Sequence, residues 1–419
     1  MILTPQMLRD DLHKAYGDAR KHKRNTLAQI EFEEDEEVNL EELYCLLVTR
    51  TYKPIPAFCF ITFDPVQREV FASQFRDRVV QHMLYNYLAP LFDRLFIHDT
   101  YSCRTGFGTT YGVERFCHHL RSVTNNFTEE AWVLMVDLSG YFMSIDKRLL
   151  IETIMNTLYK FENRISDDRI HTWGERIDIG FCEYLLHCFL DRNPSKGCIK
   201  LGKQSNWIGL PDNKKLSKSD EGIGIVIGDI ISQLFSNIIL NLTDQWAKRE
   251  RLLQHWGHYV DDHFVMSRDK ELLLQLKEYE LEEVFKERAH VNLHPKKCHI
   301  TPAYGAHLFL GAYIWPHYIA PRQRTVDKFH LKATEMEYRL MIEKPDLDTL
   351  IDIRASLNSY LGLLRQSKTF HLREKYLNRA AFGEYFTFDE YYTKATIKPE
   401  YLKDFDFLWT GGTEKVFYL

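Results

Sequence analysis

Short apolar runs alternate with amphipathic segments along the chain, and this pattern predicts a mixture of strands and helices. The runs Ala57–Phe63, Trp132–Val136 and His263–Met266 are short and rich in β-branched or aromatic residues, as is typical of buried strands. Helical spacing of apolar residues occurs in longer segments, at 6–24, 40–49, 113–123, 145–159, 179–190 and 270–288, and in segments that reach residues 95 and 251. From Pro321 onward the chain becomes helical and basic, so we expect an α+β protein.

The composition allows a sizeable hydrophobic core. The chain has 419 residues, of which 45% are hydrophobic and 14% aromatic, and this predicts two or three compact domains and excludes a largely disordered chain. A formal net charge of −5 does not by itself favour a nucleic-acid partner. The charges are segregated, however, with acidic residues at 31–42 and basic residues at 20–24, 322–332 and 365–379. A basic binding channel therefore remains compatible with the sequence.

The eight cysteines indicate neither a zinc site nor a disulfide framework, because they form no Cys-x-x-Cys pair and no regular ladder of spacings. The first residues lack a charged segment followed by an apolar run, and no apolar stretch reaches the length of a membrane span. We therefore expect a protein with reduced thiols in the cytoplasm and no membrane partner.

Two adjacent carboxylates, Asp261 and Asp262, lie between two apolar segments at a predicted hairpin tip. Like charges a few ångströms apart repel each other unless a cation or a proton lies between them, and this cost suggests a hard divalent metal ion. A solvated turn is the simpler interpretation, since aspartate is a common turn residue. The pair alone is a weak signal.

A third carboxylate, Asp137, follows the buried run Trp132–Val136. Burial there would be unfavourable without a partner, and a metal ion is one such partner. A helix cap is the alternative, but Asp146 is better placed to cap the next helix. The three carboxylates are the residue types that a two-metal phosphoryl-transfer site needs, in which two ions about 4 Å apart activate an attacking hydroxyl and stabilise the leaving pyrophosphate.

A glycine-rich loop, Gly222–Gly228, leads into a predicted helix that carries small polar residues at Ser232, Ser236 and Asn237. Glycine allows close approach of the backbone to a ligand. An ordinary loop followed by a core helix fits the same pattern.

Three arginines, at positions 68, 76 and 78, lie in a strand-like segment that leads into the helix ending near residue 95. Guanidinium groups match phosphate oxygens in a bidentate way. Ion pairs with Glu69 and Asp77 are an equally good interpretation.

Taken in order, these elements resemble the motif series of reverse transcriptases from about residue 10 to residue 380. The matching segments, from the first catalytic motif to the primer-grip hairpin, are Asp137 with Phe142, Gly224–Asn237, Tyr259–Asp262, Leu293–Lys297 and Phe309–Gly311. The resemblance implies a right-hand polymerase fold. Its parts would be an N-terminal region and fingers at 1–110, a palm at 111–320 with an insertion at about 160–221, and a helical thumb and C-terminal tail at 321–419.

The resemblance also implies an activity and roles for single residues. The activity is RNA-directed DNA polymerisation with dNTPs and two Mg²⁺ ions, which Mn²⁺ can replace, on a template RNA and an RNA/cDNA duplex. The implied metal ligands are Asp137, Asp261, Asp262 and the Leu138 carbonyl, and Lys297 would protonate the pyrophosphate. Implied nucleotide contacts are Arg68, Leu138, Phe142, Ile227, Gly228 and Gln233, with Phe142 excluding a ribose 2′-hydroxyl. Implied primer or template contacts are Arg78, Arg104, Tyr259, Leu310 and Gly311.

Within that family, the pattern Ile227-Gly228 followed by Ser232-Gln233 resembles the reverse transcriptases of diversity-generating retroelements. Further resemblances lie at residues 68–72, 75–80, 102–108 and 359–362. This subgroup implies mutagenic retrohoming, in which a template repeat is copied with frequent errors at adenines. It also implies a small basic helical-bundle accessory protein, itself oligomeric, as a partner.

Ile227 has a direct physical interpretation. A glutamine at this position could hydrogen-bond near the incoming nucleotide, whereas isoleucine cannot, and a hydrogen bond worth about 1 kcal/mol corresponds to several-fold discrimination. The sequence departs from the family pattern at Val66, Phe107, Val226 and Asp229, which puts substrate contacts near these positions in doubt. The metal carboxylates are unaffected.

Other functions fit the same sequence. A retron or phage-defence reverse transcriptase would share the catalytic residues. A group II intron maturase fits less well, because little chain follows residue 380 and there is no Cys/His cluster. A non-catalytic RNA-binding scaffold would keep the fold, but it would give no reason for three separate carboxylates to converge.

Overall fold

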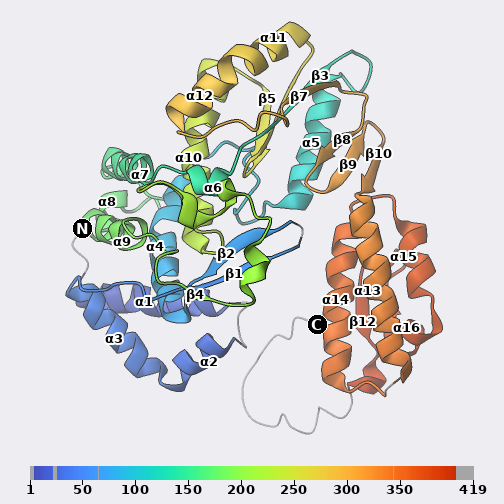
Figure 1. The fold of residues 1–419 in the computed structure, drawn as a ribbon, viewed down its shortest axis with the longest axis horizontal. Helices are drawn as coiled ribbons and strands as arrows, with labels where there is room; N and C mark the ends of the chain where they lie inside the picture. Colours follow the sequence, from blue (N-terminus) through green and yellow to red (C-terminus); the bar gives the residue numbers. More distant parts are fainter. Residues whose placement is uncertain (1–3, 22–25, 65, 343, 403–419) are drawn as a thin grey trace. The chain divides into compact units, whose positions relative to one another are not determined.

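The structure is a computed structural model that describes residues 4–21, 26–64, 66–342 and 344–402. The chain forms two compact units, and each contains both helices and strands (Figure 1). The first unit comprises Met1–Gly108 and Ala131–Thr301, and the second comprises Thr109–Glu130 and Pro302–Leu419. The α+β class expected from the sequence is confirmed.

A four-stranded sheet forms the centre of the first unit. Its strands are β3 (Trp132–Asp137), β5 (His255–Tyr259), β6 (Asp262–Ser267) and β7 (His299–Pro302), in the order β5-β6-β3-β7. Strand β6 pairs antiparallel with both β3 and β5. The inner residues of β3 and β6 are buried, which explains why both strands appear in the sequence as unbroken apolar runs.

Helices pack against this sheet and complete the core. Helix α10 (Ile230–Gln245), which continues as a π-helical turn to Glu250, is buried along most of its length and packs against α4 (Phe75–Asp93) and α7 (Lys147–Phe161). Helix α11 (Lys270–Gln275) is followed by a second π-helical turn and α12 (Leu281–Arg288). Phe285 of α12 stacks on Trp256 of β5, with ring centroids 6.3 Å apart. As predicted, Asp146 caps α7, accepting hydrogen bonds from the backbone N–H groups of Arg148 and Leu149 at 2.9 and 3.2 Å.

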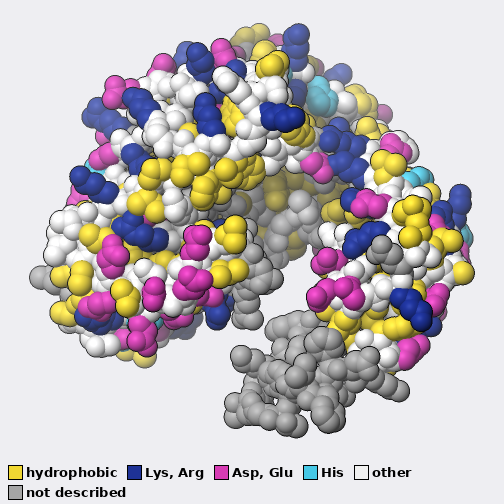
Figure 2. All heavy atoms as spheres, turned by 60° about the horizontal axis from the view of Figure 1, so that its bottom comes forward, with side chains coloured by type: hydrophobic (Ala, Val, Ile, Leu, Met, Phe, Trp, Pro, Cys, Tyr) yellow, Lys and Arg dark blue, Asp and Glu magenta, His cyan; other side chains and the backbone are white. Residues whose placement is uncertain are grey.

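Three N-terminal helices belong to the same unit, α1 (Pro5–Arg20), α2 (Leu27–Glu34) and α3 (Glu36–Val48). Arg20 donates a hydrogen bond of 2.6 Å to Glu33, so its charge is paired with a carboxylate of the same unit. Part of the predicted helix and of the basic run, residues 22–24, lies outside the described residues. On the face drawn in Figure 2, acidic and basic side chains both occur among hydrophobic ones, and this face is not uniformly basic.

A smaller sheet joins the N-terminal segment to the inserted region. Strand β1 (Phe58–Thr62) pairs antiparallel with β2 (Arg68–Ala72) and parallel with β4 (Ile199–Lys200). Residues 160–221, expected as an insertion, contain α8 (Trp173–Arg176), α9 (Ile179–Leu190), β4 and three 3₁₀ helices, Gln204–Trp207, Asp212–Lys214 and Leu216–Lys218. Helix α9 was predicted from its apolar spacing, whereas the shorter elements left no periodic signal in the sequence.

The second unit combines a hairpin sheet with a group of helices. Helix α5 (Thr109–Val123) packs on β8 (His307–Phe309), where Phe116 stacks on Phe309 at 5.0 Å. Strand β9 (Ala312–Trp315) pairs with β8 and with β10 (Tyr318–Pro321). The chain continues through α13 (Gln323–Ile342), α14 (Leu347–Leu364), α15 (Phe370–Leu377) and α16 (Ala380–Tyr385) to a short hairpin of β11 (Phe386–Phe388) and β12 (Ala395–Ile397).

The elements of a right-hand polymerase fold are present in the predicted order, with a palm-type antiparallel sheet backed by helices and a helical C-terminal region (Figure 1). The hairpin of β11 and β12 was not predicted. Residues 403–419 of the expected C-terminal tail lie outside the described residues, and the division at residues 110 and 320 stays a prediction. In the part of the chain that the structure describes, no helix is long and apolar enough to cross a membrane.

Candidate active site

The β5–β6 hairpin brings its carboxylates to the end of β3. The hairpin turn consists of Val260 and Asp261, and Asp262 begins β6 directly opposite Asp137, the last residue of β3. Residues opposed in this way have Cβ atoms about 5 Å apart. The backbone N–H of Leu138 donates to the carbonyl of Asp261 at 3.3 Å, which ties the turn to the same edge of the sheet.

The hairpin turn itself is strained. Val260 has φ +53°, a left-handed conformation that β-branched residues rarely adopt. Its backbone N–H donates to the hydroxyl of Ser102 at 3.3 Å, and its carbonyl lies 3.2 Å from Nδ1 of His258. The surrounding structure therefore holds the turn in a conformation that the local sequence disfavours.

Burial, together with the neighbouring carboxylates, destabilises the charged forms of Asp261 and Asp262. Burial, followed by Asp261 and Asp137, raises the pKa of Asp262 to about 7. The pKa of Asp261 is also raised, first by burial and then by Asp137. Arg68 and Lys297 act in the opposite direction on both groups without cancelling the shifts. The site has more negative charge than its own cations balance.

Lys297 is the cation in direct contact with this group. Its Nζ donates to Oδ2 of Asp137 at 2.9 Å, although 56% of the Lys297 side chain is exposed. A hydrogen bond of 2.7 Å from the backbone N–H of His294 to the carbonyl of Asp137 fixes the segment that carries Lys297 beside β3.

Arg68 is the first residue of β2. Its positive charge lowers the pKa of both Asp261 and Asp262, so it acts electrostatically on these carboxylates. Its neighbour Glu69 is not its partner. Glu69 instead accepts hydrogen bonds from Nε1 of Trp207 and the backbone N–H of Leu216, each at 2.9 Å. Asp77 accepts from Tyr52 and from the backbone of Ile55, each at 2.8 Å, and it also lies 3.9 Å from the guanidinium of Arg76. The alternative of an ion pair with Asp77 is therefore confirmed for Arg76.

The residue types at this edge fit a hard divalent cation, because carboxylate and carbonyl oxygens are the ligands that Mg²⁺ prefers. Asp137, Asp261, Asp262 and the Leu138 carbonyl would hold it. Among the described residues, however, no group of three or more His, Cys, Asp and Glu side chains is already gathered closely enough to hold a metal ion. The carboxylates share one edge of the sheet, and Lys297 occupies one oxygen of Asp137.

Phe142 and Ile227, which lie far apart in the sequence, pack against the same apolar cluster of Cys59, Phe71, Met143, Leu216 and Val226. Phe142 belongs to the short helix α6 (Tyr141–Ser144) that follows β3. The backbone N–H of Ile225 donates to the carbonyl of Phe142 at 2.8 Å. The first and second expected motifs are thus directly joined.

Gly228 is required by a close approach of two backbones. It has φ +132°, and an added Cβ would overlap the carbonyl oxygen of Phe71. The neighbouring carbonyl of Ile227 accepts a hydrogen bond of 2.9 Å from the backbone N–H of Phe71. The glycine loop therefore lies alongside β2.

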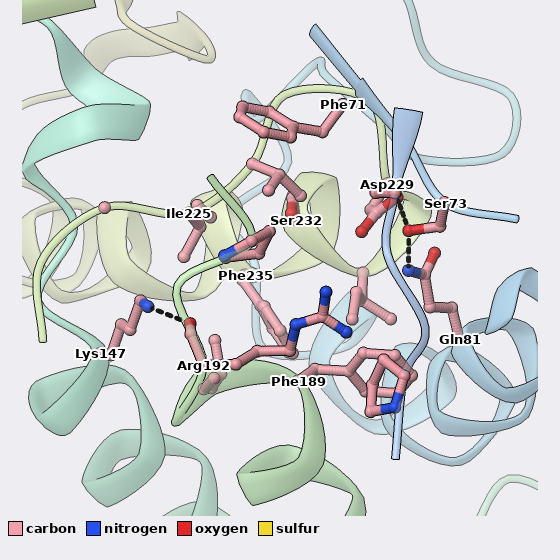
Figure 3. A pocket seen from close by; sticks show the side chains of 17 residues that line it. Phe71, Ser73, Gln81, Lys147, Phe189, Arg192, Ile225, Asp229, Ser232 and Phe235 are labelled. Carbon is pink, nitrogen blue, oxygen red and sulfur yellow. Dashed lines mark hydrogen bonds between the residues drawn. The ribbon is translucent and has the colours of Figure 1, made fainter. Parts of the chain in front are cut away.

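Behind this loop is a small cavity of about 40 Å³ (Figure 3). Asp229 lines it and accepts a hydrogen bond of 2.8 Å from Ser73, whose hydroxyl accepts one of 2.9 Å from Gln81. Burial raises the pKa of Asp229 to about 6. Ser232, Ser236 and Asn237, expected as polar positions along the helix, are all buried.

The positions of three other residues with an implied role are as follows. Gln233 is exposed on the first turn of α10. Arg78 is half-buried beside Asp229, and burial lowers its pKa. Tyr259 is half-buried at the end of β5, next to the turn.

Arg104 has a local role in the structure. Its guanidinium donates to Asp93 at 2.6 Å and to the carbonyls of Ile97 and Thr100 at 3.0 and 3.2 Å, and it stacks over Phe107. Leu310 and Gly311 form the β8–β9 turn of the second unit, with φ of +50° and +81°.

A buried polar network, which no pattern in the sequence indicates, lies beneath the hairpin. Asp244 of α10 accepts hydrogen bonds from Nε1 of Trp256 at 2.7 Å and from Thr100 at 3.1 Å, and it lies 3.0 Å from Nε2 of His258. Burial acts against its charged form, but His258 and Trp256 hold the pKa of Asp244 below its usual value. A single aspartate among the polar residues of a largely buried helix has no pattern that would reveal this role.

A second connection runs from α10 to the hairpin turn. Asn237 and Ser102 exchange two hydrogen bonds of 2.8 Å, and the Ser102 hydroxyl accepts from the backbone of Val260. Both networks anchor the carboxylate-bearing turn to the same buried helix.

No protein-family model and no curated protein matches the chain. Among solved structures, it is similar to the telomerase of Candida albicans in complex with a TWJ fragment of telomeric RNA, with a TM-score of 0.44, 10% identity, and coverage of 83% of this chain and 59% of that one. The apo telomerase of Candida tropicalis, truncated from its C-terminal domain, gives a TM-score of 0.43, 12% identity and coverage of 68% and 60%. The Candida tropicalis telomerase in complex with a TWJ fragment of telomeric RNA gives a TM-score of 0.42 and 12% identity, with coverage of 80% of this chain and 58% of that one. The chain thus spans less than two-thirds of these telomerase chains.

Proposed function

We propose that this protein is an RNA-directed DNA polymerase. The observation that carries the proposal is the pairing of Asp137 with Asp262 across β3 and β6, with Asp261 in the adjoining turn. Opposed like charges destabilise a sheet, and two networks anchored on α10 hold this arrangement in place. A site maintained against its own repulsion is typical of a cation-binding active site.

The chain's own residues would position the substrates. Arg68 and Lys297 flank the carboxylates and could bind the triphosphate of an incoming nucleotide, since both cations already act on the same charges. Phe142 and Ile227 form an apolar wall between the first and second motifs, against which a sugar and base could pack. Bound Mg²⁺ would supply Lewis acidity at the reacting phosphate.

A primer-extension assay tests the proposal. Purified protein is given an RNA template, an annealed DNA primer, dNTPs and Mg²⁺, and we expect template-directed extension that stops when the metal is chelated. Substituting Phe142→Ala removes the ring and should increase incorporation of ribonucleotides relative to deoxyribonucleotides. Absence of extension on any primed RNA template would contradict the proposal.

We further propose that the polymerase is of the error-prone type found in diversity-generating retroelements, with a template-repeat RNA and a small basic accessory protein as partners. The support is Ile227, whose apolar side chain faces the shared cluster where a glutamine could have donated a hydrogen bond. Sequencing the cDNA should reveal an excess of substitutions at template adenines, and Ile227→Gln should lower that excess several-fold. An error spectrum without adenine bias would favour a retron or phage-defence enzyme.

A non-catalytic RNA-binding scaffold is the second candidate. It is favoured by the contact between Lys297 and Asp137 and by the absence, among the residues described, of a gathered cluster of metal-binding side chains. The two candidates differ in Mg²⁺-dependent dNTP binding, measured by calorimetry on the protein with a primed template. A scaffold would bind the RNA and show no metal-dependent binding of dNTP.

A further inference from the structure

The second unit contains a hollow of about 420 Å³ that no part of the proposed active site uses. Three segments distant in the sequence form it: the end of α5, the β9–β10 turn, and the segment that follows α14. We call it the basic hollow. Its lining residues are Cys117, Arg121, Trp315–Ile319 and Arg365–Lys368.

The charge of the basic hollow is entirely positive. Arg121, Arg365 and Lys368 line it, and no aspartate or glutamate does. All three side chains are exposed, and none of them forms an ion pair with another described residue. In a chain with a formal net charge of −5, three unpaired cations around one hollow favour an anionic ligand.

Aromatic rings form one wall of the same hollow. Trp315 and Tyr318 flank the β9–β10 turn with ring centroids 5.6 Å apart, and Nζ of Lys368 lies 5.6 Å from the centroid of the Tyr318 ring. Tyr318 is 44% exposed, so part of its ring is available to a ligand. Exposed aromatic rings beside cations are the combination that binds single-stranded nucleic acid, because bases stack on the rings while phosphates meet the cations.

Hydrogen bonds and ring contacts hold these segments together before any ligand binds. The backbone N–H of Lys368 donates to the carbonyl of Ile319 at 3.2 Å, and Gln366 donates to the hydroxyl of Thr110 on α5 at 2.6 Å. His317 packs edge-on against Phe127 at 4.8 Å. A preformed site loses less conformational entropy on binding.

We propose that the basic hollow binds a single-stranded segment of RNA, with phosphates on Arg121, Arg365 and Lys368 and a base stacked on Tyr318. The hollow lies at the opposite end of β9 from the Leu310–Gly311 turn, the expected primer contact. It would therefore hold a part of the RNA other than the paired primer end. The inference takes RNA as the partner from the proposed function, but binding here needs neither metal nor dNTP.

Photo-crosslinking locates the site directly. An unstructured RNA 10-mer carrying 4-thiouridine is irradiated with the full-length protein in EDTA, and the crosslinked peptides are mapped. We expect crosslinks in residues 313–320. An excess of unlabelled RNA should remove them, whereas mononucleotide at the same nucleotide concentration should not. Crosslinks confined to the first unit, or equal competition by mononucleotide, would overturn the proposal.

Affinity measurements provide the second readout. By fluorescence anisotropy without metal, we expect Tyr318→Ala and the double variant Arg121→Gln/Arg365→Gln each to weaken RNA binding at least about fivefold. Lys394→Gln, which removes an exposed cation of the same unit outside the hollow, is the matched control and should change binding little. Melting curves check that each variant folds.

Equal losses in the control and the hollow variants would indicate non-specific attraction and overturn the proposal. If the basic hollow does not bind RNA, primer extension still tests the polymerase activity. The outcome for one proposal therefore does not decide the other.

Discussion

Asp229 is a buried side chain whose raised pKa is not evident from the local sequence. At Asp229 the sequence departs from the reverse-transcriptase pattern that it resembles. This side chain lines a cavity together with Lys147 and Arg192 (Figure 3), and burial is the main cause of its raised pKa, which Asp77 raises further and Arg78 lowers. Its pKa of about 6 lies above the reference value of 3.8. The folded protein therefore binds this proton more tightly than the unfolded chain does.

Asp229 should make the protein less stable as the pH rises. Its contribution to the free energy of unfolding is fully present below about pH 4 and is lost as the pH rises through about 6. Asp229→Asn removes this dependence, so the variant should gain about 2 to 3 kcal/mol relative to the wild type between pH 4 and pH 7. Urea unfolding at a series of pH values measures the difference, with the exposed Asp212→Asn as control. A constant difference across that range would show that Asp229 is not protonated in the folded state.

The three carboxylates could be predicted from the sequence because each adjoins an unbroken apolar run, and such runs are buried strands. The roles of the arginines could not. Arg68, Arg78 and Arg104 were all implied to contact substrates. Only the fold shows that Arg104 is occupied by Asp93 and neighbouring carbonyls, whereas Arg68 acts on the carboxylates. Long side chains reach several elements, and their choice of partner is a tertiary property.

At the scale of elements, close packing of the glycine loop on β2 joins the first and second motifs. Gly228→Ala would place a Cβ against the carbonyl of Phe71 and impose an unfavourable φ. We expect a loss of about 1 to 3 kcal/mol in the free energy of unfolding and weaker dNTP binding. Gly17→Ala in α1 is the control, since nothing lies within 4 Å of its added Cβ, and it should stabilise the helix by up to about 1 kcal/mol. Equal effects of both substitutions would refute the close approach.

The network beneath the hairpin predicts a second element-scale effect. Asp244→Asn leaves His258 without its buried charged partner and should cost about 3 to 5 kcal/mol, measured by urea unfolding. Asp191→Asn breaks an aspartate–histidine pair of the same 3.0 Å length, with His187, that is exposed on α9, and should have little effect. Similar losses in both variants would mean that burial of the Asp244 pair contributes nothing.

Elements were easier to predict than their connections. The helices with clear apolar periodicity, such as α9 and α5, were found within a few residues. The links from α10 to the hairpin were missed because Thr100 and Ser102 lie more than 130 residues from Asn237 and Asp244, and a polar residue in a buried helix gives no periodic signal.

At the scale of the whole molecule, the proposed nucleic-acid partner would bind to a chain with net negative charge. Segregation of the cations makes this possible, so binding of a primed template should depend steeply on salt. Measured by anisotropy between 50 and 200 mM KCl, the logarithm of the association constant should fall linearly with the logarithm of salt concentration, with a slope of about 0.9 for each phosphate contact. Binding that is independent of salt would contradict a phosphate-binding channel.

All eight cysteines are within the described residues and are free, so no disulfide contributes to the fold. The proposed activity depends instead on the carboxylates that oppose each other across β3 and β6. When a charged group that is retained for function at a cost to stability is neutralised, the protein is expected to lose activity while its stability stays the same or rises.

The direct test compares the wild type with Asp262→Asn in primer extension with Mg²⁺ and in thermal melting at pH 8. Because the substitution removes one of two opposed charges, we expect a melting temperature equal to or above that of the wild type, while incorporation of dNTPs falls at least about a hundredfold. Unchanged incorporation by Asp262→Asn, or no incorporation by the wild type, would contradict the proposal that these carboxylates form a polymerase active site.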